Sequence, residues 1–197
     1  MAAPVSIAFT HVHSLRLGSG AEALAARVLL ADGTAGFGFT LNDDAGMARD
    51  MAAWDALGRA KAVPLRALLG GIYRKKIRIE KDENPSIPPD WTALRKGILD
   101  SNYDLLRIDP FAWGSVEQVV TIAAAAAAFD LGIALLAPNA HPWEIQYCAA
   151  LAATLRGEDT KIIVRSGPSS SISVSESPGN EINWSLEPAF SKIQWQS

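Results

Sequence analysis

Apolar and polar residues follow different patterns in the two halves of the chain. Near the N-terminus, residues 5–17 are rich in β-branched and apolar side chains with partial alternation, which predicts a β-strand. Apolar runs at 27–31 and 35–41 flank an Asp-Gly pair, which is a strong hairpin signal in that position. Residues 45–62 then place apolar side chains every three or four positions, which predicts a helix with one buried face. The chain is therefore expected to begin as an α+β module.

The second half alternates between strand patterns and helix patterns. We expect strands at 77–80, 103–109, 132–137 and 161–165, and helices at 91–99, 115–129 and 142–156. Such alternation is typical of parallel strands joined by right-handed crossovers. The serine-rich run at 166–177 is expected to be a low-complexity linker or a loop.

Composition narrows the class of protein. The 197 residues are 49% hydrophobic and 20% charged, with a net charge of -3, which indicates a globular chain and not a disordered one. We expect neither nucleic acid nor a membrane as a partner, because the chain has no basic patch and no uninterrupted apolar span. The lone Cys148 and the absence of a secretory pattern suggest the cytoplasm. A complete eight-unit α/β barrel alone needs roughly 200 residues, so a side domain leaves no room for one.

Two residues occupy positions where parallel α/β proteins place their sites. Asp109 ends one predicted strand, and His141 follows the next, just before a helix. Neighbouring strands lie about 4.8 Å apart, so a carboxylate–imidazole pair is within reach, and such a pair makes a general base. The alternative is that Asp109 merely terminates a strand and His141 merely begins a helix.

Other groups of polar residues are weaker candidates for a functional site. His11 and His13 share one face of a predicted strand and could bind a metal, but a solvated strand face is the simpler interpretation. Glu80, Asp82 and Glu83 could supply oxygen ligands to magnesium, and the alternative is a solvated acidic loop. We expect Cys148 to be a buried structural thiol.

Several segments resemble the mandelate racemase and muconate-lactonizing branch of the enolase superfamily. They are ADGTAGFGFT at 31–40, MAAWDALGRAKAVPLRALLGGIYRKKI at 51–77, a strand–helix–strand–helix stretch at 105–154 and PGNEINW at 178–184. The resemblance implies an α/β fold, with an α+β capping domain followed by a partial, incomplete TIM-type βα barrel. It places a shortened capping domain at 1–76, the partial barrel at 77–177, and at 178–197 a C-terminal tail that packs back on the capping domain.

The resemblance also implies a chemistry. Members of this family bind Mg²⁺ on barrel carboxylates, and a base removes the proton α to a substrate carboxylate, as in acid-sugar dehydratases and racemases. Asp109 matches the aspartate and His141 the histidine of the catalytic pair, while Glu80 or Glu83 matches one metal ligand. The implied substrate is a small-molecule carboxylate or sugar acid.

The sequence also departs from the family pattern. The Lys-x-Lys base motif has no counterpart, since Lys75 and Lys76 are adjacent, and two ligand-bearing strands are missing. The chain thus resembles a member with internal deletions, and an alternative function is a catalytically inactive remnant or reduced scaffold. A half set of βα units leaves open sheet edges, so a homo-oligomer is also expected.

Overall fold

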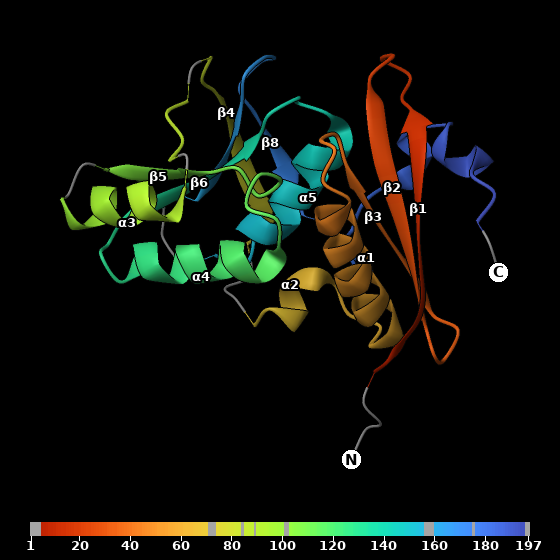
Figure 1. Ribbon diagram of the computed structural model, residues 1–197. Coiled ribbons are helices and arrows are strands. Elements are labelled where there is room, and N and C mark those ends of the chain that lie inside the picture. The colour runs from red at the N-terminus through yellow and green to blue at the C-terminus, as the bar shows by residue number, and fades with distance from the viewer. Residues whose placement is uncertain are drawn as a thin grey trace. The chain divides into compact units, whose positions relative to one another are not determined.

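The computed structural model describes residues 5–70, 74–83, 85–88, 90–100, 103–155, 160–174 and 176–195, which form two compact units (Figure 1). The first unit comprises Met1–Leu68 together with Glu176–Ser197, and the second comprises Leu69–Ser175. The C-terminal segment therefore joins the N-terminal unit, and the second unit is a single excursion of the chain out of the first.

The first unit is a three-stranded antiparallel sheet covered by a helix. Its strands β1 (Ile7–Arg16), β2 (Glu22–Leu30) and β3 (Ala35–Thr40) pair in chain order. The predicted hairpin is confirmed: Gly33 has a φ of 86°, and the Asp32 carboxylate accepts a hydrogen bond from the backbone N–H of Thr34. Two helices follow, α1 (Ala45–Ala60), which the Asp44 side chain caps, and the short α2 (Leu65–Leu68).

Helix α1 lies unusually close to β3 because small residues face each other there. A Cβ on Gly36 would lie 2.1 Å from the backbone nitrogen of Ala56, and one on Gly38 would lie 2.1 Å from the carbonyl oxygen of Ala48. The alanines of α1 fill the same interface, where Ala48, Ala52 and Ala56 are fully buried. The glycines of AGFGFT therefore serve to bring the helix backbone onto the sheet.

A buried carboxylate joins the C-terminal segment to this unit. Asp55 of α1 is fully buried and accepts hydrogen bonds from the backbone N–H of Phe37 at 2.8 Å, the backbone N–H of Asn180 at 2.6 Å and Nε of Arg59 at 2.7 Å. The Asn180 side chain in turn donates to the carbonyl oxygens of Phe37 and Met51. Burial raises the pKa of Asp55, and the Arg59 guanidinium opposes that rise.

Gly179 fits into this network only because it has no side chain. Its φ is 85°, and a Cβ there would lie 2.0 Å from Oδ1 of Asp55. Its backbone donates to the carbonyl oxygen of Val63 and accepts from the N–H of Leu65. A Cβ on Gly58 would lie 2.7 Å from the Gly179 Cα, so both glycines are needed for the contact. The two motifs recognised in the sequence, around Trp54–Gly58 and Pro178–Trp184, are thus halves of one interface.

Substituting Gly179 with alanine is expected to destabilise this unit more than backbone strain alone explains. Gly33 is a matched control, since its φ is 86° and nothing lies within 4 Å of a Cβ placed there. We expect Gly33→Ala to cost about 1 kcal/mol of unfolding free energy, from the left-handed backbone, and Gly179→Ala at least about 3 kcal/mol, because a clash is added. Urea unfolding measures both, and equal losses would contradict the proposed packing.

A second acidic residue of the C-terminal segment is buried beside an arginine. Glu181 forms an ion pair with Arg66 of α2, and its Oε2 is buried without a hydrogen-bond partner. Burial raises the pKa of Glu181 from its ordinary 4.5 to about 7, although the Arg66 charge opposes the rise. Folding therefore favours the protonated form of this carboxyl group.

Stability should fall as the pH rises through this window. Between pH 4.5 and about 7 the folded state keeps the Glu181 proton that the unfolded state has lost, so each increase in pH favours unfolding. Thermal melts over this range should show a steeper loss of stability in the wild type than in Glu181→Gln, which does not titrate. Glu22→Gln, at an exposed strand position, is the control and should keep the wild-type profile; parallel profiles for all three proteins would refute the assignment.

The second unit is an open sheet with helices. Its elements are β4 (Lys76–Lys81), α3 (Trp91–Leu99), β5 (Leu105–Ile108), α4 (Val116–Ala127), β6 (Gly132–Ala137), α5 (Pro142–Ala152), β7 (Lys161–Val164) and β8 (Ser170–Ser173). The strand order is β5-β6-β7-β4-β8, and every pair is parallel except β4 with β8. The predicted alternation is confirmed, but the expectation of a loop at 166–177 is wrong for 170–173, because β8 pairs there through its backbone. The predicted helix end at Arg156 lies outside the described residues.

The pairing of β4 with β7 is the one that closes a βα barrel. In a complete barrel the first strand lies next to the last, and here the first parallel strand of the unit lies next to its last. The described residues supply four parallel strands, about half of an eight-strand barrel. The fold is therefore a partial barrel, as the sequence predicts.

The segment between β4 and α3 covers one face of this open sheet. Leu105, Ala134, Leu136 and Ile163 lie on that face, and Ile87 packs against them. The register places Glu80 beside Ile163 on the same face. The loop thus shields apolar side chains that further strands would cover in a closed barrel.

Candidate functional site

The carboxyl ends of β5 and β6 bring the predicted pair into the same region. Ile108, the last residue of β5, lies opposite Leu135, and β6 continues to Ala137, so the carboxyl ends of both strands lie at the same edge of the sheet. Asp109 directly follows β5, and His141 is four residues beyond the end of β6, where α5 begins. The structure therefore places both residues where the sequence analysis expects a site.

Asp109 is held by its own loop. Its Oδ1 accepts hydrogen bonds from the backbone N–H groups of Phe111 at 2.9 Å and Ala112 at 3.3 Å. Burial raises the pKa of Asp109, while these two N–H groups and the positive charge of Arg165, beyond β7, oppose the rise. The contacts of the Asp109 carboxylate do not include the expected hydrogen bond to His141. The catalytic role of Asp109 therefore stays a prediction.

His141 caps helix α5 through its side chain. Its Nδ1 accepts a hydrogen bond from the backbone N–H of Trp143 at 3.2 Å, and the imidazole lies edge-on to the Trp143 ring. Because Nδ1 accepts, the proton of the neutral ring is on Nε2. In this state His141 can donate a proton from Nε2, whereas acting as a base there requires the other tautomer.

Glu144 is a buried acid of this region that the sequence analysis did not single out. One of its oxygens accepts from the Asn139 side chain at 2.8 Å, and the other accepts from the backbone N–H of Asn139 at 2.9 Å and of His141 at 3.4 Å. Burial raises its pKa, and the nearby charge of Asp109 acts in the same direction. The signal that could have revealed it is the capping box, with His141 before Pro142 and Glu144 at the third helical position.

Replacing Glu144 should destabilise the loop that carries His141. We expect Glu144→Ala to cost about 3 kcal/mol, since it leaves buried donors unpaired. Glu117→Ala, in the exposed first turn of α4, is the control and should change stability by less than about 0.5 kcal/mol. Chemical unfolding compares the two; a loss in Glu144→Ala as small as in the control would show that the carboxylate does not order this loop.

The two predicted metal ligands are both paired with lysines. Glu80 accepts from Nζ of Lys161 at 2.6 Å and lies 3.6 Å from Arg78, and Glu83 accepts from Nζ of Lys81 at 2.6 Å on the surface. Within the described part of the chain, no three His, Cys, Asp or Glu side chains gather closely enough to hold a metal ion. These residues therefore do not fit a magnesium site.

His11 and His13 do share one strand face, as predicted, but the expectation that this face is solvated is wrong. Their rings stack at 4.2 Å between centroids, and Trp195 covers them edge-on, 5.3 Å from the His13 ring. Nearly parallel rings point their lone pairs in separate planes, which is a poor geometry for a shared metal. Cys148 is fully buried as predicted, and burial raises the pKa of its thiol.

Comparisons with known proteins identify the fold. Similar solved structures include a racemase from Streptomyces coelicolor A3(2) with bound magnesium, with a TM-score of 0.72, 11% identity, and coverage of 95% of this chain and 100% of the other. The mandelate racemase/muconate lactonizing enzyme from Bordetella bronchiseptica RB50 gives 0.74 and 12%, with coverage of 95% and 100%. The L-Ala-D/L-Glu epimerase from Bacillus subtilis gives 0.65 and 12%, with coverage of 90% and 98%.

The chain has the same enolase-type fold as these solved structures. No protein-family model and no curated protein sequence matches it. At identities of 11–12%, the structural similarity establishes the capping domain and the barrel-type architecture of this enolase-fold chain, and nothing more specific. Among the described helices, none combines the length and apolar character needed to cross a membrane.

Proposed function

We propose that this enolase-fold chain is a reduced scaffold that does not carry out magnesium-dependent proton abstraction. The observation behind the proposal is the pairing of Glu80 with Lys161 and of Glu83 with Lys81, which occupies both predicted ligands. The reaction of the family needs a strong positive charge beside the substrate carboxylate, because the carbanion formed after proton loss is otherwise too unstable. The described residues supply no such metal centre.

Acid–base chemistry of the racemase or acid-sugar dehydratase type is the second candidate. Its support is the gathering of Asp109, His141 and Glu144 at the carboxyl ends of β5 and β6, with two carboxyl groups whose pKa burial raises. Solved structures of similar fold include a racemase with bound magnesium and an epimerase. Under this candidate, Mg²⁺ and a small sugar acid would bind near Asp109, with His141 as the proton-transfer group.

One pair of measurements distinguishes the two candidates. The reduced-scaffold proposal predicts that millimolar Mg²⁺ leaves the melting temperature unchanged, because a ligand stabilises only a fold that binds it. It also predicts no exchange of α-protons for deuterium when a panel of sugar acids is incubated with the protein and Mg²⁺ in D₂O. Exchange that disappears in both Asp109→Asn and His141→Gln would establish the enzymatic function and overturn the proposal. Glu22→Gln, at an exposed position of β2 in the first unit, is the control for these variants.

We also propose that the open sheet edges favour self-association. Strand β5 forms one end of the described sheet, and β8, which consists of serines and Ile172, forms the other. Light scattering of the purified chain tests this expectation independently of any catalytic activity.

A further inference from the structure

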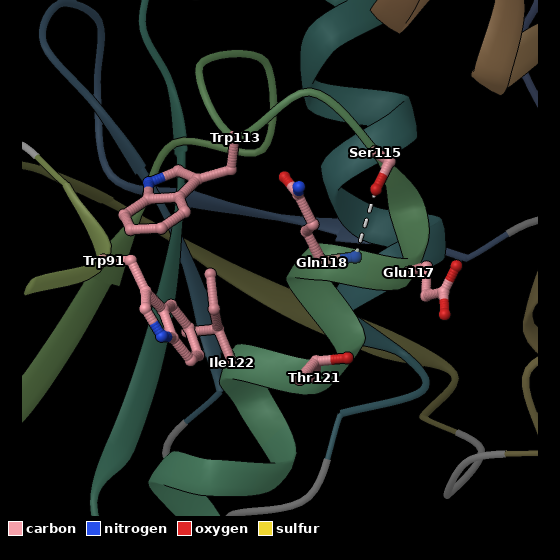
Figure 2. Close-up of a pocket in the computed structure, with 7 residues that line it drawn as sticks. All are labelled: Trp91, Trp113, Ser115, Glu117, Gln118, Thr121 and Ile122. Atoms are coloured by element: carbon pink, nitrogen blue, oxygen red, sulfur yellow. Dashed lines mark hydrogen bonds between the residues drawn. The ribbon is translucent and has the colours of Figure 1, made fainter. Parts of the chain in front are cut away.

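Two adjoining hollows lie between α3, α4 and the loop that follows β5. The first has a volume of about 470 Å³ and is lined by Trp91, Trp113, Ser115, Glu117, Gln118, Thr121 and Ile122 (Figure 2). The second has a volume of about 430 Å³ and is lined by Ile87, Pro88, Asp90, Asp109, Ala112, Trp113 and Gln118. Trp113 and Gln118 line both hollows, so the two adjoin, and we refer to them together as the cleft.

Two tryptophans form the apolar wall of this cleft. The rings of Trp91 and Trp113 are 6.2 Å apart between centroids, with their planes at 71°, and Trp91 is 49% exposed although it is a large aromatic residue. Figure 2 shows both rings on one side of the hollow, with the Gln118 side chain reaching up beside Trp113. At this distance the two rings touch edge to face, so together they make one continuous apolar wall of the hollow.

The polar lining of the cleft carries only negative charge. Asp90, Asp109 and Glu117 contribute carboxyl groups, and none of the described lining residues is a lysine or an arginine. Asp90 and Asp109 each use Oδ1 to accept backbone N–H groups, at 2.8 Å from Ala93 and 2.9 Å from Phe111. These bonds hold the two carboxylates in place at the wall of the second hollow. An anionic ligand such as a sugar acid is therefore disfavoured here.

We propose that this cleft binds a small organic cation of the alkylammonium class. An indole face attracts a cation through its negative quadrupole, and methylated ammonium groups combine positive charge with an apolar surface that packs against the half-exposed Trp91 ring and its neighbour Trp113. The carboxylates of Asp90 and Asp109 supply the countercharge, and Gln118 supplies an amide for a polar group on the same ligand. This proposal does not depend on the reduced-scaffold function, and it competes with the alternative enzymatic one, which would place a sugar acid near Asp109.

The test compares two ligands of the same shape. Choline and its uncharged isostere 3,3-dimethylbutan-1-ol differ essentially in the charge of the quaternary centre, and isothermal titration calorimetry at fixed ionic strength measures both. We expect choline to bind at least about tenfold more tightly than the isostere. Methyl β-glucoside serves as a neutral sugar probe and should not compete.

Three variants locate the site. Trp91→Leu should weaken choline binding at least about fivefold by removing one aromatic wall. Asp90→Asn should weaken it several-fold while the helix stays capped, since asparagine caps as well as aspartate. Trp195→Leu removes a tryptophan from the other unit and should leave choline binding unchanged. Circular dichroism confirms that each variant is folded.

Equal affinity for choline and its isostere would overturn the proposal in favour of a purely apolar pocket. Tighter binding of methyl β-glucoside than of choline would overturn it in favour of a neutral sugar site. Absence of saturable choline binding to the folded wild-type chain would overturn it outright.

Discussion

The structure of the first unit depends on the buried carboxylate of Asp55. This single group ties α1 to β3 through Phe37 and to the returning chain through Asn180, and its own charge is balanced by Arg59. A carboxylate buried without such partners would be very unfavourable, so each bond is required by the others. Because Asn180 is fixed here, the chain must leave the first unit and return to it.

That requirement also explains how the second unit begins and ends. The excursion begins at β4 and ends at β8, and the two strands pair directly, with Lys76 opposite Ser173 and the N–H of Val174 donating to the carbonyl oxygen of Lys75. Strand β7 lies on the other side of β4. The pair that closes a barrel, β4 with β7, is thus present although the described unit has only about half the strands of a barrel. Ile87 covers apolar residues that further strands would shield.

Much of this fold could be predicted from the sequence because its signals are local. The hairpin depends on the neighbouring residues Asp32 and Gly33. Helices begin at capping residues such as Asp90 and Ser115, which directly precede segments with apolar side chains at helical spacing. Strand β8 could not be predicted, because a run of serines pairs through its backbone and shows no alternation. The extension of β2 back to Glu22 was also missed, because alanines are weak indicators of a strand.

The candidate site was less predictable because its properties arise from distant partners. Position along the chain places Asp109 and His141 at strand ends, but only the fold shows that Oδ1 of Asp109 is occupied by its own loop and that Nδ1 of His141 caps a helix. Likewise, nothing near Glu80 in the sequence reveals that Lys161 will neutralise it. Residues that match a catalytic motif in the sequence make capping and ion-pairing contacts in this structure. The contacts of these acids therefore come from neighbours that only the fold brings together, which is why position along the chain alone does not reveal them.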